Sequence, residues 1–189
     1  MTAEPDVQFD FVKPLEGWQT VTGQWSVEDV PGAVQGKALV QRATNNSFNV
    51  IVAPGGPYAN VDVSVRFKPI SGREDASGGI VFRFSDGRYY LIRANALEDN
   101  FRLYYVDPSS FFTFVTGGRY EITGVDTKAP ALDQWHSLRI AAQGNRIEGW
   151  LNGQHLIDHR DNRYAVGRVG LWTKADSITA FDSLVVRPI

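Results

Sequence analysis

Cysteine is absent from the 189-residue sequence. This absence excludes disulfide bonds, thiolate metal ligands and cysteine nucleophiles. No apolar run approaches the roughly 20 residues that a membrane-spanning helix needs. A basic excess is missing as well, because 19 Lys and Arg stand against 21 Asp and Glu and the formal net charge is -2. Nucleic acid is therefore not an expected partner, since proteins that bind it usually carry a basic surface.

The sequence also shows no pattern typical of a leader segment, a long helix or a linker. The first residues, 1–6, contain neither a basic start nor an apolar core, so they do not resemble a signal peptide. No long stretch has apolar residues at the three- and four-residue spacing of a helix. No Pro- or Ser-rich segment divides the chain, and we therefore expect one domain over residues 1–189.

Alternation of apolar and polar residues with period two dominates from about residue 37 onwards. In residues 61–68, valine and phenylalanine alternate with polar residues, as in a strand with one buried face. Turn signals such as Asn152-Gly153 and Asp86-Gly87 separate these runs. Without helices to cover a sheet, two sheets must bury each other's apolar faces. The sequence predicts an all-β, two-sheet antiparallel sandwich of about a dozen strands.

Short motifs in the C-terminal half carry a resemblance. Trp135-His136 opens one apolar run, Trp150-Leu151-Asn152-Gly153 follows it, and residues 167–177 contain a Gly-x-Val-Gly strand. The pattern resembles the concanavalin A-like jelly rolls. Within them it resembles the bacterial domains grouped with 3-keto-disaccharide hydrolases and laminin-G-like domains, over about residues 9–187. The resemblance implies a jelly roll in a periplasmic or extracellular protein concerned with carbohydrate, although this fold hosts many roles.

The catalytic signature of the family 16 glycoside hydrolases, which share that fold, is missing. A retaining glycosidase needs two carboxyl groups about 5 Å apart, and no two Glu residues share one short strand segment here. A site assembled from distant strands stays open. Its catalytic candidates are Glu148, His155 and Asp176, which would transfer protons in a glycoside or 3-keto-sugar hydrolase.

The histidines do not predict a metal site. His155 and His159 are four residues apart, but four residues of a strand cover about 13 Å, so both cannot bind one ion. No cofactor is expected. One alternative stays open, because related jelly rolls often bind a structural calcium between the first and last strands. Asp10 and Asp182 lie at suitable positions and offer oxygen ligands, unless they are ordinary turn carboxylates.

The strongest functional signal is a set of cationic and aromatic residues on the solvent-facing side of the strands. Its register depends on the Asp86-Gly87 turn. A two-residue loop would bury Arg93, whereas a three-residue loop with Gly87 in a bulge turns Arg93 outward; we adopt the second, since a buried unpaired guanidinium is costly. The predicted ligand-binding residues are Arg83, Tyr89, Arg93, Asn95, Arg102, Trp150, Trp172 and Lys174.

These residue types suit a saccharide. Aromatic rings stack on the C–H faces of sugars, and Arg and Asn donate paired hydrogen bonds. We therefore predict a carbohydrate-binding module for an oligo- or polysaccharide, and the Arg content favours an acidic one. The rim loops at residues 94–100 and 117–124, with Glu98 and Asn100, are an alternative site.

Three other interpretations stay open. The outward residues can form an ordinary solvated face, and the domain can be the hydrolase considered above. It can also be a laminin-G-like protein-interaction domain. An exposed aromatic lip at residues 111–114 would favour that last role.

Overall fold

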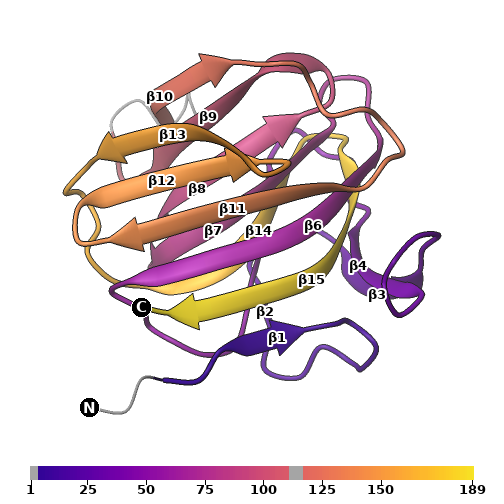
Figure 1. The fold of residues 1–189 in the computed structure, drawn as a ribbon. Helices are drawn as coiled ribbons and strands as arrows, with labels where there is room; N and C mark the ends of the chain where they lie inside the picture. Colours follow the sequence, from indigo (N-terminus) through magenta and orange to yellow (C-terminus); the bar gives the residue numbers. More distant parts are fainter. Residues whose placement is uncertain (1–3, 111–116) are drawn as a thin grey trace.

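The computed structural model describes residues 4–110 and 117–189. This part of the chain contains β-strands and no helix, and hence no helix that could cross a membrane. The strands form two antiparallel sheets that pack face to face (Figure 1). The predicted all-β jelly-roll sandwich is therefore confirmed.

Sheet A has eight strands, seven of them in a continuous order, while β1 (Val7–Phe9) pairs with the last strand of the chain. The continuous order is β13 (Gln154–Arg160), β12 (Arg146–Leu151), β11 (His136–Gln143), β6 (Val61–Ser71), β15 (Ile178–Pro188), β4 (Lys37–Gln41) and β3 (Trp25–Asp29).

Sheet B has seven strands and lies behind sheet A in the view of Figure 1. Its order is β10 (Arg119–Asp126), β9 (Glu98–Val106), β8 (Arg88–Asn95), β7 (Ser77–Ser85), β14 (Arg168–Lys174), β5 (Phe48–Val52) and β2 (Gln19–Thr20).

The main core lies between the two sheets. In β6 the side chains of Val63, Val65 and Phe67 are buried, while their polar neighbours point outward, as the period-two pattern predicts. Phe82 of β7 and Phe181 of β15 fill the same layer. Burial of each such side chain stabilises the fold by roughly 1.5–3 kcal/mol.

The hairpin between β7 and β8 has its bulge in a different place from the predicted one. Ser85 pairs with Arg88, so Asp86-Gly87 is a two-residue turn whose φ angles, 49° and 78°, are both positive. The bulge lies within β7 instead, where Arg83 adopts a φ of 51°. The bulge changes the facing of Arg83 and leaves Arg93 on the outer side of the sheet.

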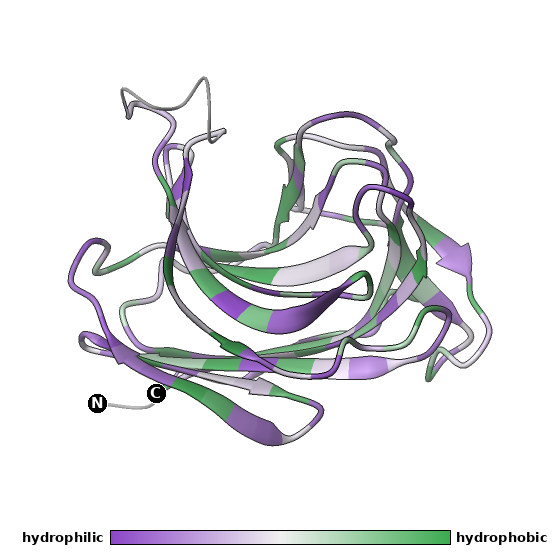
Figure 2. Ribbon diagram, turned by 90° about the horizontal axis from the view of Figure 1, so that it is seen from above, coloured by the Kyte–Doolittle hydropathy of each residue, from purple (hydrophilic) through white to green (hydrophobic). Residues whose placement is uncertain are grey.

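Sheet B is strongly curved, and its hollow side faces away from sheet A (Figure 2). A second apolar cluster covers this outer side, in addition to the main core. Outer faces of antiparallel sheets are usually polar, yet this outer cluster is apolar and its members are only 0–6% exposed. The cluster consists of Val50, Val52, Val81, Tyr89, Leu91, Tyr104, Val106 and Trp172.

Candidate ligand-binding groove

A groove of about 560 Å³ lies on the hollow side of sheet B. Phe48 and Phe84, both half-buried, contribute to its apolar walls. Two half-buried cations, Arg119 and Lys174, stand among these apolar groups. Ligand pockets typically have this size and this composition, with apolar walls and a few polar groups that fix orientation.

Aromatic rings surround the guanidinium of Arg119. Its Cζ atom lies 4.4 Å from the ring centroid of Tyr104, 5.5 Å from that of Phe48 and 5.6 Å from that of Trp172. Burial lowers the pKa of Arg119, but an arginine stays charged at neutral pH. The described residues offer this guanidinium aromatic faces and neither a hydrogen bond nor an ion pair.

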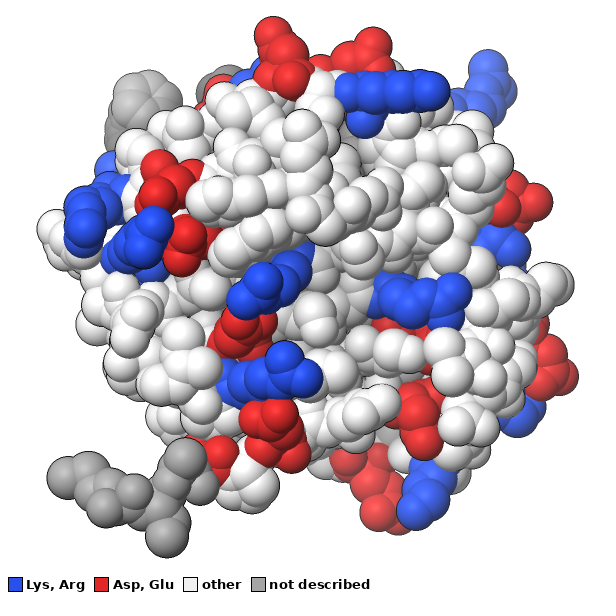
Figure 3. Space-filling model, in the orientation of Figure 1, with Lys and Arg blue, Asp and Glu red and all other residues white. Residues whose placement is uncertain are grey.

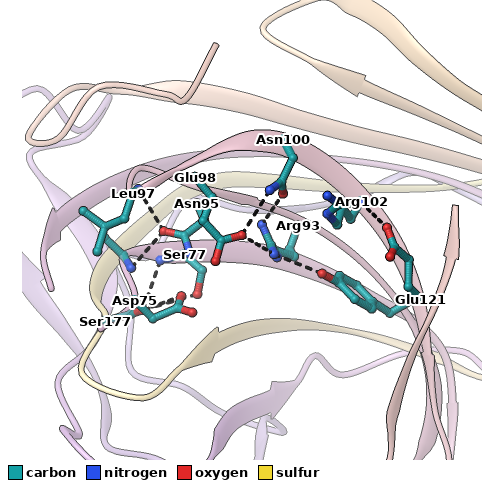
Figure 4. A network of polar contacts seen from close by, with 12 residues as sticks. Asp75, Ser77, Arg93, Asn95, Leu97, Glu98, Asn100, Arg102, Glu121 and Ser177 are labelled. Carbon is teal, nitrogen blue, oxygen red and sulfur yellow. Dashed lines mark hydrogen bonds and ion pairs between the residues drawn. The ribbon is translucent and has the colours of Figure 1, made fainter. Parts of the chain in front are cut away.

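Arg93, in contrast, is fully engaged by its own chain (Figure 4). It donates to the Glu98 carboxylate at 2.8 Å, to the Asn100 amide oxygen at 2.8 Å and to the Tyr104 hydroxyl at 3.0 Å. Burial would raise the pKa of Glu98, but the charge of Arg93 and the hydrogen bonds outweigh this effect and lower it. Arg93 therefore shapes one side of the hollow rather than offering free donors.

Arg102 is likewise paired, since it bonds Glu121 on the neighbouring strand (Figure 4). This hydrogen bond raises the pKa of Arg102. Of the cations predicted to bind ligand, Lys174 alone lines the groove without a hydrogen bond or ion pair among the described residues.

A smaller cavity of about 250 Å³ adjoins the groove and shares Asn46 and Lys174 with it. Asp75 lines this cavity and accepts a hydrogen bond from the Ser177 hydroxyl at 3.2 Å. Burial raises the pKa of Asp75. Neither Asp75 nor Arg119 was singled out from the sequence, although Arg119 lies within the rim segment 117–124.

The two remaining predicted residues on the hollow side are aromatic, and neither offers a free ring face. Tyr89 is buried at the edge of the groove, and Trp172 is completely buried. The Trp172 ring packs against Phe48 at a centroid distance of 5.4 Å. The expectation that Trp172 stacks on a sugar is therefore wrong in its geometry, and the ring supports the Arg119 side chain instead.

Arg83 does not face the groove. Because of the β7 bulge, its guanidinium donates to the backbone carbonyls of Ala59 at 2.8 Å, Tyr164 at 2.9 Å and Gly144 at 2.7 Å. Arg83 is 2% exposed, so it fixes three loops at the rim of the sandwich and is not accessible to a ligand. The sequence places Arg83 on the open face because the alternation of Ile80, Phe82 and Phe84 predicts an unbroken strand, and the bulge at Arg83 interrupts this alternation.

Asn95 is also inaccessible, since it is completely buried at the end of β8. Its side-chain oxygen accepts the backbone N–H groups of Ala76 at 3.1 Å and Leu97 at 3.0 Å (Figure 4). The residue therefore holds the β8–β9 turn in place. Its predicted location on the open face is wrong.

Trp150 points outward as predicted, but from the opposite side of the molecule. It lies on β12 of sheet A, with the Arg139 guanidinium 4.2 Å from its ring centroid and the His155 ring 4.8 Å away. Period-two alternation distinguishes inward from outward residues but does not say which sheet a strand joins. Trp150 and the groove cannot form one surface.

The three catalytic candidates do not come together either. His155 Nε2 lies 3.3 Å from the Glu148 carboxylate on the outer face of sheet A, and Glu148 also pairs with Arg146 at 3.1 Å. Asp176 follows β14 of sheet B and accepts backbone N–H groups of residues 73–75. These hydrogen bonds lower the pKa of Asp176. The predicted trio is therefore not one site.

The two aspartates considered for calcium are engaged in other contacts. Asp182 accepts from Arg66 at 3.1 Å and from the Val34 N–H at 2.7 Å, and Asp10 accepts from the Val12 N–H at 3.3 Å. Within residues 4–110 and 117–189, no three His, Asp or Glu side chains are grouped so as to hold a metal ion. The aromatic lip expected at residues 111–114 lies outside the described residues.

The fold and groove define a jelly-roll domain with a concave outer sheet. Residues 9–187 match the model of the 3-keto-alpha-glucoside-1,2-lyase-like domain, and the chain belongs to this family. A levanase of Bacillus subtilis (strain 168) is 26% identical over 163 residues. The match covers 85% of this chain but 21% of the levanase, so the chain spans about a fifth of that relative.

Solved structures share the fold at low sequence identity. The carbohydrate-binding module CBM66 from Bacillus subtilis has a TM-score of 0.74 and 19% identity, covering 92% of this chain and 97% of that module. A Bacillus subtilis protein of unknown function with a galectin-like fold has a TM-score of 0.70 and 10% identity, covering 99% of this chain and 97% of that one. At these identities the likeness shows a common fold.

Proposed function

We propose that this domain is a carbohydrate-binding module that holds a saccharide in the groove of sheet B. One observation carries the proposal: a groove of about 560 Å³ combines aromatic walls, Phe48 and Phe84, with the free polar groups of Arg119 and Lys174. Sugars need both features, because they present apolar C–H faces together with hydroxyl groups. The levanase relative and the CBM66 likeness support the same conclusion.

We also propose that the preferred saccharide is acidic and is met in the periplasm or outside the cell. The free cations of the groove support the first point. The second rests on the carbohydrate-active proteins that this chain resembles, a levanase and a carbohydrate-binding module. Fractionation of the native host tests the location, and a chain found only in the cytoplasm would contradict it.

A binding measurement with matched variants tests the main proposal. Isothermal titration of the protein with levan oligosaccharides and with neutral and acidic plant and bacterial oligosaccharides is expected to show saturable binding. Phe48→Ala removes a groove wall and should weaken binding roughly tenfold. Trp150→Ala, on the opposite face, is the control and should leave the affinity unchanged. Binding that survives Phe48→Ala but is lost in Trp150→Ala would move the site to sheet A.

A reaction on the bound sugar is the second candidate function, and Asp75 favours it. This carboxyl opens into the cavity beside the groove and has a raised pKa, whereas the pKa of Glu98 on the same side of the sheet is lowered. Opposite shifts of this kind suit an acid and a base. Incubation with glycosides and 3-keto-glucosides tests it: released product that disappears in Asp75→Asn would support catalysis. An inert wild-type protein across that panel would reject it.

A further inference from the structure

Most arginines of the described chain have a hydrogen-bonded or ionic partner, and the exceptions are informative. Arg93 and Arg102 bond Glu98 and Glu121, and Arg83 bonds three carbonyl groups. The side chains of Arg73 and Arg119 have no such partner within residues 4–110 and 117–189. Arg73 is exposed, so water solvates it, whereas Arg119 is half-buried in the groove.

A half-buried cation without a counter-charge is costly, because the protein removes part of its hydration. The rings of Tyr104, Phe48 and Trp172 compensate this loss in part through cation–π contacts. These rings also prevent Arg119 from swinging away, so they present the guanidinium fork in one place. The N–H donors of the Arg119 guanidinium are therefore available to a hydrogen-bond acceptor that the described residues do not supply.

Lys174 adds a second cation to the same groove, and its side chain has no hydrogen bond or ion pair with any described residue. The buried carboxyl of Asp75 lines the adjoining cavity together with Lys174, and it forms no ion pair with Lys174 or Arg119 among the described residues. Glu98, which also acts on Arg119, is already paired with Arg93 at 2.8 Å. The groove thus has a net attraction for an anionic group.

We propose that Arg119 and Lys174 form an anion subsite that binds the carboxylate of a uronic acid residue in the saccharide. The proposal rests on the proposed saccharide-binding function and names the chemical group of the saccharide that the groove recognises. A carboxylate has two coplanar oxygens that match the guanidinium fork, and the ammonium group of Lys174 adds a point charge. The sugar ring that carries the carboxylate would then lie against Phe48 or Phe84.

Matched ligands that differ only in charge test this subsite. We would titrate the protein with oligogalacturonate, oligomannuronate and oligoglucuronate, and with the methyl ester of each. The wild-type protein should bind at least one acid roughly tenfold to a hundredfold more tightly than its ester. This preference should shrink as salt is raised, because exposed ionic attraction is screened.

Variants then assign the preference to Arg119. Arg119→Gln should abolish the preference for the acid, because the acid loses far more affinity than its ester when the guanidinium is removed. Arg119→Lys keeps the charge but loses the fork, and should retain part of the preference. Arg102→Gln changes an arginine already paired with Glu121 and serves as the control with full preference. Thermal unfolding of each variant verifies that it is folded; should Arg119→Gln not fold, Lys174→Gln provides the same comparison.

The outcomes separate this proposal from the general one. Equal binding of acid and ester, or a preference that survives Arg119→Gln and Lys174→Gln, would overturn the anion subsite. Binding of levan or of esters alone would also overturn it, while the carbohydrate-binding function would stand. No binding to any saccharide would reject both.

Discussion

The two outward faces of the sandwich are built from similar residue types but differ in how their charges are matched. On the outer face of sheet A, Arg139 pairs with Asp62 at 2.6 Å across neighbouring strands, and Arg146 pairs with Asp158 at 2.8 Å. Figure 3 shows this face, where basic and acidic side chains lie beside one another. On the hollow face of sheet B, by contrast, Arg119 stands over aromatic rings and has no acidic partner in the part of the chain that the structure describes.

This difference teaches that residue type alone does not mark a binding surface. In a cross-strand row of opposite charges, each charged side chain already has an ionic partner on the neighbouring strand, and water solvates the rest of it. A cation left unmatched among apolar walls leaves a free interaction for a ligand. The partners of an arginine are therefore more informative than its exposure.

The two tryptophans predicted to bind ligand give the largest expected difference between the faces. Trp172→Ala should lower the free energy of unfolding by about 3–5 kcal/mol, because it leaves a cavity beneath Arg119. Trp150→Ala should cost about 1 kcal/mol, since it removes surface stacking only. Urea unfolding of both variants measures the difference. Similar losses in the two variants would show that the buried Trp172 ring contributes no more to stability than the surface-exposed Trp150 ring.

The two paired arginines give an intermediate effect. The Arg93 side chain is 5% exposed, so Arg93→Gln should lower the free energy of unfolding by about 2 kcal/mol and leave Glu98 without its counter-charge. The Arg139 side chain is 45% exposed, and Arg139→Gln should cost less than about 1 kcal/mol. Chemical denaturation at low and high salt measures both; salt should reduce the second cost and hardly change the first.

The smallest expected effect is an opposite response of the two faces to acid. Burial raises the pKa of Asp75 above 3.8, so the folded state binds this proton more readily and gains stability as the pH falls through the folded pKa. The Arg146 hydrogen bond lowers the pKa of Asp158, so its contribution is present above the unfolded pKa and lost as the pH falls through the lowered folded value.

Unfolding midpoints between about pH 7 and about pH 3 test this sign difference. Asp75→Asn should remove a gain of stability on acidification, and Asp158→Asn should remove a loss. Parallel pH profiles for the two variants would contradict the assignment.

Much of the fold could be predicted from the sequence because alternation is a strong signal. Residues 61–68 fix which side chains of β6 are buried, and the absence of helices leaves a sandwich as the means of covering both sheets. Arg93 lies on the outer side of the sheet, as the adopted register predicts, but it is buried there and paired with Glu98, and the bulge is at Arg83 instead of Gly87. The sequence gives little indication of where a bulge lies, since Asp86-Gly87 is compatible both with a two-residue turn and with a three-residue loop that has its bulge at Gly87.

The groove itself was harder to predict. Trp150 and Trp172 have the same period-two signal, but they belong to different sheets, and only the pairing of distant strands decides this. Arg119 was named only as part of the rim segment 117–124. Its significance depends on rings from β5, β9 and β14, which are far apart in the sequence.

Pairing of β1 with β15 has a consequence for how the domain can be tethered. Val7 lies opposite Val186 in this antiparallel pair, so the first and last strands leave the fold side by side. Both belong to sheet A, on the far side of the molecule from the hollow of sheet B (Figure 2). A fusion partner or a solid support attached at either end therefore leaves the mouth of the groove open.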